Sequence, residues 1–152
     1  MHPLRLYAFG HPRLPGVLDL EAHYLKLLRP VARMEVMEIP EIKGDPAQAL
    51  KREAVALQTR LKGTPRPILL DAGGPQRSSE ELATWLGAKL DRGEVPTFVL
   101  GSSHGFDPSI KALWPDRLSL SPLTFPHDLA RVMLLEQLFR SLSILRGGPY
   151  HK

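Results

Sequence analysis

A serine between two glycines is the residue of this chain whose setting most directly suggests chemistry. Residues 101–105 read Gly-Ser-Ser-His-Gly after a short apolar run, the setting of a serine-hydrolase nucleophile, which would be Ser103. Acid and base partners follow in the order of that fold, from Asp116 or Asp128 and from His127 or His151. Such a serine sits where a helix begins, whereas Asp107-Pro108 predicts the next helix start several residues later. A serine hydrolase is therefore one alternative for the function.

The last three residues, Tyr150, His151 and Lys152, combine side chains that suit an RNA substrate. A tyrosine can stack on a base, a histidine titrates near neutrality and a lysine can meet a phosphate. A terminal tripeptide is usually disordered, so we expect its removal to change thermal stability little. Arg140 is a further candidate for binding negative charge, although Glu136 four residues earlier predicts an ordinary surface ion pair.

The composition narrows the classes of function that are open to the chain. No Gly-x-Gly-x-x-Gly or Gly-x-x-x-x-Gly-Lys motif is present, which disfavours dinucleotide and nucleoside-triphosphate chemistry. The six histidines lack a paired helical spacing, so we predict no metal site, and zero cysteines exclude disulfides. A formal net charge of +4 favours a polyanionic partner, so a basic RNA-binding module without catalysis is a second alternative. No signal peptide or membrane span is visible, and we expect a cytoplasmic protein.

Hydrophobic periodicity predicts alternating strands and helices along the 152 residues. Apolar runs predict strands at residues 4–9, 34–39, 67–70, 96–100 and 117–121. Apolar residues at three- and four-residue spacing predict helices at residues 18–28, 46–61, 78–93 and 108–114, and a long buried helix at 128–145. No linker or repeat divides the chain. The order is typical of one α/β domain, residues 1–152, with a parallel sheet flanked by helices.

Three loops follow the ends of predicted strands, after Leu70, Leu100 and Leu120. Ligands of parallel α/β sheets bind outside the carboxyl ends of the strands, so we expect a site among these loops. Pro122 and Pro126 bracket a turn that presents bare backbone there. On spacing alone, the simpler interpretation of that segment is a turn before a helix.

Three segments of the carboxyl-terminal third resemble a known family. The segments are Leu-Ser-Leu-Ser-Pro-Leu-Thr-Phe-Pro-His at residues 118–127, Glu-Gln-Leu-Phe-Arg at 136–140 and Pro-Tyr-His-Lys at 149–152, with Arg131 between the first two. Together they resemble the RlmH family of SPOUT-class ribosomal RNA methyltransferases. The resemblance implies a C-terminal trefoil knot and a homodimer with its active sites at the interface. It also implies transfer of a methyl group from S-adenosylmethionine to N3 of a pseudouridine in large-subunit (23S) ribosomal RNA.

The resemblance also implies which residues form the site. The S-adenosylmethionine pocket would include Leu70, Gly101, Leu120, Ser121, Pro122, Leu123, Thr124 and Phe125. This chain departs from the family at Ser102, where a second glycine is common. The RNA side would include His127, Tyr150, His151 and Lys152. His151 is the candidate base for the acceptor proton, and Arg140 the candidate for charge that develops on the uracil oxygens.

Overall fold

The computed structural model describes all 152 residues and has five strands and five helices. The strands are β1 (His2–Phe9), β2 (Ala32–Ile39), β3 (Ile68–Leu70), β4 (Thr97–Leu100) and β5 (Arg117–Leu118). The helices are α1 (Val17–Leu28), α2 (Pro46–Arg60), α3 (Ser79–Asp91), α4 (Pro108–Leu113) and α5 (His127–Leu145). Every strand and helix that the sequence predicts is present, with small shifts at the boundaries.

The five strands form one parallel sheet in the order β2-β1-β4-β3-β5, which confirms the predicted fold class. The register pairs Ala8 and Leu70 with Leu100, and Leu70 also with Leu118. The carboxyl ends of four adjacent strands therefore meet at one edge of the sheet. The loops that leave β3, β4 and β5 start side by side there.

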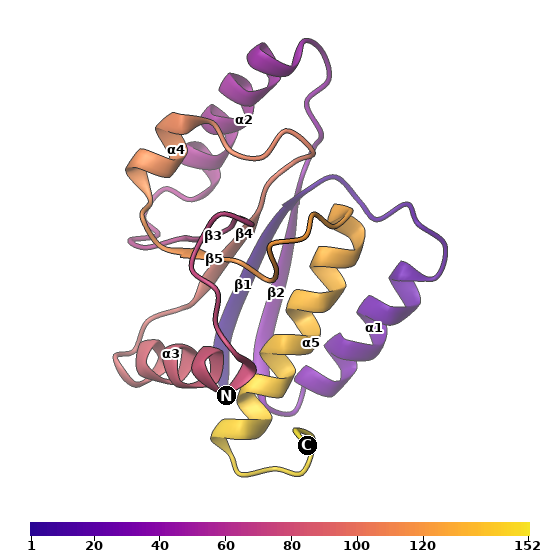
Figure 1. Cartoon of the computed structure of the whole chain (residues 1–152), viewed down its shortest axis with the longest axis vertical. Helices are drawn as coiled ribbons and strands as arrows, with labels where there is room; N and C mark the ends of the chain where they lie inside the picture. The colour runs from indigo at the N-terminus through magenta and orange to yellow at the C-terminus, as the bar shows by residue number, and fades with distance from the viewer.

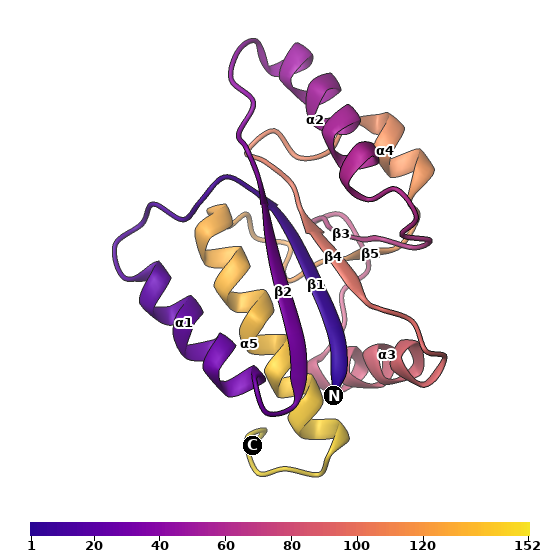
Figure 2. The same ribbon diagram turned by 180° about the vertical axis from the view of Figure 1, so that it is seen from behind.

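Helices cover both faces of the sheet, as Figures 1 and 2 show. Helices α1, α3 and α5 lie on one face, and α2 and α4 on the other. Alternate residues of a strand point to opposite faces, so Leu6 and Phe98 join the first core while Tyr7 and Val99 join the second. The central strands β3 and β4 are buried on both sides, as their continuous apolar runs predict, whereas the edge strand β2 is only partly buried.

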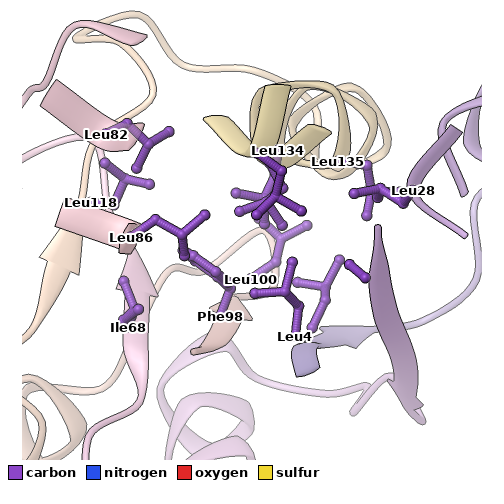
Figure 3. Packing of buried hydrophobic residues seen from close by; sticks show 14 of the residues in the cluster. Leu4, Leu28, Ile68, Leu82, Leu86, Phe98, Leu100, Leu118, Leu134 and Leu135 are labelled. Carbon is purple, nitrogen blue, oxygen red and sulfur yellow. The ribbon is translucent and has the colours of Figure 1, made fainter. Parts of the chain in front are cut away.

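Helix α5 supplies the centre of the first core. Figure 3 shows Leu134 and Leu135 of α5 pointing onto the sheet over Leu4 and Phe98, and both are buried. Removing a leucine side chain from such a site costs about 2–5 kcal/mol. The predicted buried packing helix is therefore confirmed, and it lies between α1 and α3.

A buried ion cluster that the sequence did not predict holds α5 against α1 and β2. Arg131 is 4% exposed and donates from Nε and Nη2 to the two carboxylate oxygens of Glu21, at 2.8 and 2.9 Å. Its Nη1 donates to Glu38 at 3.3 Å. Bidentate pairing satisfies a guanidinium that would otherwise be costly to bury. The cluster fixes the rotation of α5 and so the direction of the residues at its start.

The fifth strand is shorter than predicted, because it ends at Leu118 rather than at residue 121. After Leu118 the chain forms only an isolated bridge between Gln76 and Ser119. The Ser119 hydroxyl lies 3.0 Å from the carbonyl oxygens of both Ala72 and Ser121. These contacts turn the backbone away from the ladder, so the next residues form a loop over the end of β3.

Candidate functional site

The three loops at the carboxyl edge of the sheet enclose one pocket, where the sequence predicts a site. Its volume is about 160 Å³, and a wider hollow of about 550 Å³ shares much of its lining. The lining includes seven of the predicted residues, Leu70, Gly101, Leu120, Ser121, Leu123, Thr124 and Phe125. Pro122 is exposed and does not line it. The structure also adds residues that sequence reasoning missed, among them Asp71 and Phe106.

Gly101 lies in the wall of the pocket and is buried. A Cβ atom on Gly101 would lie 3.0 Å from the carbonyl oxygen of Gly105 and 3.2 Å from the Phe106 ring. The family resemblance places Gly101 in the donor pocket, where a glycine can let a ligand approach the backbone closely. The atoms that need the space belong instead to the protein's own loop, which packs directly on Gly101.

The loop after β5 lines the pocket and carries unpaired backbone N–H groups. The N–H groups of Leu120, Thr124 and Phe125 form no hydrogen bond within the chain, whereas Leu123 donates to the Ser121 hydroxyl at 3.0 Å. Free donors beside apolar side chains can bind the edge of a heteroaromatic ring. The loop therefore carries donors that a ligand in the pocket could use.

Ser103 lacks the surroundings of a nucleophile. It is exposed in a tight turn that the Gly105 N–H closes by donating to the Ser102 carbonyl at 3.0 Å. Helix α4 begins only at Pro108, so no helix starts at the serine. None of the hydrogen bonds that histidine rings form involves Ser103. The geometry therefore disfavours the hydrolase alternative.

The rim of the pocket is polar. His127, predicted to face the RNA, is the first residue of α5 and lines the pocket. Asp71 follows the end of β3 and also lines the pocket, and its carboxylate is 3.4 Å from the Lys111 ammonium group. Asp128 accepts hydrogen bonds from the N–H groups of Arg13 and Leu14, at 2.7 and 2.8 Å, which ties the start of α5 to the β1–α1 loop.

The C-terminal tail packs against the end of α5, contrary to the expectation of a free tripeptide. The Tyr150 hydroxyl donates to Glu136 Oε1 at 3.0 Å, and its ring meets the Phe139 ring edge-on at 4.7 Å between centroids. Burial, followed by the bond to Glu136, raises the pKa of Tyr150, so the phenol stays protonated. Lys152 is exposed.

Arg140 and His151 are in direct contact. Arg140 donates from Nε and Nη2 to Glu136 at 3.0 and 2.6 Å, which confirms the predicted ion pair, and this bond raises the pKa of Arg140. Its Nη1 lies 3.1 Å from His151 Nδ1, while His151 Nε2 lies 2.8 Å from Glu80 Oε1. Because Arg140 can only donate, Nδ1 accepts and Nε2 carries the proton toward Glu80. The bond from His151 also lowers the pKa of Glu80.

The pocket and the tail lie at opposite ends of α5 (Figure 1). Ala130 lines the pocket and Arg140 contacts the tail, so about ten helical residues, or about 15 Å, separate them. The structure thus brings seven of the eight predicted donor-site residues and His127 together in one pocket, whose lining does not include Arg140, Tyr150, His151 or Lys152. A second cavity, of about 580 Å³, lies along α5 beside Arg140 and Tyr150, and Leu120 also lines it.

The fold and the pocket define an α/β protein with a pocket at the carboxyl edge of a parallel sheet, the edge where such sheets hold their ligands. The structure holds no group of three or more His, Cys, Asp or Glu side chains placed to bind a metal ion. No helix combines the length and apolar character that crossing a membrane requires.

A family model described as "Predicted SPOUT methyltransferase" matches residues 2–151. The chain therefore belongs to the SPOUT methyltransferase family, as its motifs suggested.

Several relatives align over nearly the whole chain. "Ribosomal RNA large subunit methyltransferase H" of Gloeobacter violaceus is 40% identical over 149 residues, with 97% of each chain covered. The protein of the same name from Solidesulfovibrio magneticus is 39% identical over 153 residues, with 99% of each covered. A probable methyltransferase of Bordetella pertussis superposes with a TM-score of 0.60 at 18% identity, covering 93% of this chain and 95% of its own. That likeness shows the fold alone.

Proposed function

We propose that the protein is an S-adenosylmethionine-dependent methyltransferase that modifies N3 of a pseudouridine in large-subunit ribosomal RNA. The observation that carries the proposal is the pocket of a SPOUT chain, built from the three loops that hold the donor-site residues implied by the family resemblance. Full-length relatives named for large-subunit ribosomal RNA support the substrate class. A ribosomal substrate would place the activity in the cytoplasm.

The pocket residues fit the methyl donor. The free N–H groups of Leu120, Thr124 and Phe125 can bind the adenine edge, and the side chains of Leu70 and Phe106 can cover its faces. When bound, S-adenosylmethionine supplies an electrophilic methyl group on a sulfonium centre. Asp71, on the pocket wall, adds a negative group that suits a cationic ligand.

The acceptor nitrogen must lose its imide proton as the new N–CH3 bond forms and the S–CH3 bond breaks. Arg140 can stabilise negative charge on the uracil oxygens through its guanidinium. His151 can accept the proton at Nδ1 only when the Arg140 hydrogen bond to that atom is released. Holding donor and acceptor in line can itself lower the barrier by about 7–11 kcal/mol in the best cases.

We infer that the enzyme works as a homodimer. In one chain the pocket and the tail are at opposite ends of α5, so the tail of one subunit would supply the RNA side of the active site whose donor pocket lies in the other subunit. The family resemblance further leads us to propose a trefoil knot in the carboxyl-terminal third, where residues 119–126 pass the loop after β3.

Two measurements on the intact protein test the proposal. Calorimetry with S-adenosylmethionine should show saturable binding, which a non-catalytic RNA-binding module would lack. Ribosomes that lack the modification should then gain one labelled methyl group in the RNA of the large subunit, which nuclease digestion and mass spectrometry would assign to N3 of a pseudouridine. Binding without transfer, or transfer to another nucleotide, would contradict the proposal.

A further inference from the structure

A buried carboxylate that the proposed chemistry does not use lies behind the wall of the pocket. Glu53 belongs to α2 and is 3% exposed. Its Oε2 accepts a hydrogen bond from the Ser102 hydroxyl at 2.7 Å, and Glu53 forms no ion pair. A buried carboxyl group with so little compensation destabilises a fold relative to an apolar side chain. We therefore expect Glu53 to have a role other than packing.

The Ser102 hydroxyl connects Glu53 to the turn of residues 102–105. A hydroxyl has one proton, which Ser102 donates to Glu53, so its lone pairs are free to accept. One of them accepts the N–H of His104 at 3.3 Å. The Ser102 carbonyl accepts the N–H of Gly105 at 3.0 Å, which closes the turn. Glu53 thus holds the turn through a single side chain.

This turn forms part of the pocket wall. Gly101, Ser102 and Gly105 all line the pocket, and Gly101 packs directly on the Gly105 carbonyl. Ser103, His104 and Gly105 are exposed, so solvent lies on the outer side of the turn. The hydrogen bond from Ser102 to Glu53 is the attachment of the turn to buried structure on α2.

We propose that Glu53 is a positioning residue, which holds the 102–105 turn through Ser102 in the form that completes the methyl-donor pocket. The inference rests on the proposed function. Glu53 lines not the methyl-donor pocket but an adjacent hollow of about 260 Å³, which Ser102 also lines, so it acts on the donor through Ser102. Loss of the contact loosens the turn and weakens donor binding, while the chemical step at saturating donor is retained.

Alanine variants at both positions test the contact. Ser102→Ala and Glu53→Ala should each raise the Kd for S-adenosylmethionine about tenfold, because a hydrogen bond to a carboxylate is lost. The Kd of the double variant should be no higher than that of the single variant with the higher Kd, because the two substitutions remove the same hydrogen bond. Glu53→Gln keeps an acceptor oxygen and should stay within about threefold of the parent protein.

Two further readouts separate positioning from general destabilisation. The single-turnover methylation rate at saturating donor should change by less than about threefold, so KM moves and kcat does not. Amide hydrogen exchange at residues 102–105, measured without ligand, should be faster in the alanine variants. Thr59→Ala is the control, because it removes an α2 hydroxyl that bonds only to the Val55 carbonyl of its own helix.

Several results would overturn the inference. These are unchanged affinity and exchange in folded Ser102→Ala, additive losses in the double variant, or damage from Glu53→Gln equal to that from Glu53→Ala. If Glu53→Ala does not fold, the Ser102→Ala and Glu53→Gln variants still test whether the contact positions the turn. A parent protein that does not bind S-adenosylmethionine would instead refute the proposed function, and hydrogen exchange would still test the Glu53 contact.

Discussion

At the scale of single residues, Gly101 shows how a missing side chain shapes the pocket. The space beside its Cα is filled by the Gly105 carbonyl and the Phe106 ring, so any side chain there must push the 102–106 segment outward. A glycine in this position is needed by the protein's own packing. A substitution at Gly101 would then affect ligand binding indirectly, by displacing the wall of the pocket.

Gly101→Val should weaken S-adenosylmethionine binding at least about tenfold and lower stability by about 1–3 kcal/mol, because the side chain overpacks the wall. Calorimetry and thermal unfolding measure the two effects. Gly73→Ala is the matched control, since a Cβ there meets only Asp71 Oδ1, at an ordinary 3.7 Å. Unchanged affinity in folded Gly101→Val would place the donor elsewhere.

Ser103→Ala should leave methyl transfer largely intact, because the serine is exposed and has no histidine partner. Fluorophosphonate probes should not label the parent protein. Mass spectrometry of probe-treated protein checks this directly, and a covalent adduct on Ser103 would restore the hydrolase alternative.

At the scale of elements, the start of α5 is attached to the β1–α1 loop by one carboxylate. Burial of Asp128 favours its neutral form, but the hydrogen bonds from the Leu14 and Arg13 N–H groups outweigh that effect and lower its pKa below 3.8. A lowered pKa in the folded state means that the ionised carboxylate stabilises the protein. This stabilisation is present above the pKa of the unfolded chain and is lost as the pH falls through the folded-state pKa.

Asp128→Ala should therefore lower stability at pH 7, by about 1–2 kcal/mol for the lost charged hydrogen bonds. The difference from the parent protein should begin to shrink as the pH falls below about 4, where the unfolded chain becomes protonated, and should disappear only below the lowered pKa of the folded-state carboxylate. Urea unfolding at pH 7 and at pH 3 measures both values. An equal difference at the two pH values would mean that packing, not the carboxylate, makes the attachment.

Deleting residues 150–152 should destabilise the protein by about 1–3 kcal/mol, more than a free tail would, because the Phe139 edge contact and the bond to Glu136 are lost. Affinity for S-adenosylmethionine should stay near that of the parent protein. Single-turnover methylation of ribosomes should fall about a hundredfold or more if His151 acts as the base, and His151→Ala should reproduce part of that loss. A truncated protein with the full rate would leave Arg140 as the main catalytic candidate.

At the scale of the whole molecule, the separation of pocket and tail in one chain raises the question of whether a second subunit supplies the tail.

Two inactive chains should complement each other when they are co-expressed: Gly101→Val, with a defective pocket, and the tail deletion. In a random mixture half of the dimers are mixed, and each has one complete site, so about a quarter of the parent activity should return. Separate affinity tags isolate the mixed dimer, and light scattering gives its mass. A mixed dimer without activity would mean that each site is built from one chain.

The sequence by itself determined the elements and the face that each buries, because hydrophobic period, proline position and capping residues act locally. The alternation of Leu6 and Tyr7 and the Ser78 capping box are both readable from the chain and both present. The motifs also pointed to the loops that line the pocket. These signals act over a few residues, so no knowledge of the packing is needed to read them.

Only the tertiary structure decided which groups meet. The ion cluster joins Arg131 to Glu21 across 110 positions, and the Ser102 contact reaches Glu53 across 49. Neither pair can be recognised from a repeating pattern in the sequence. A long-range pair depends on how the helices and strands pack against one another, not on the spacing of residues along the chain. The prediction of a free C-terminal tail was wrong for the same reason. The tail is ordered by contacts with Phe139 and Glu136 on α5, which the terminal tripeptide can make only once the helix has packed.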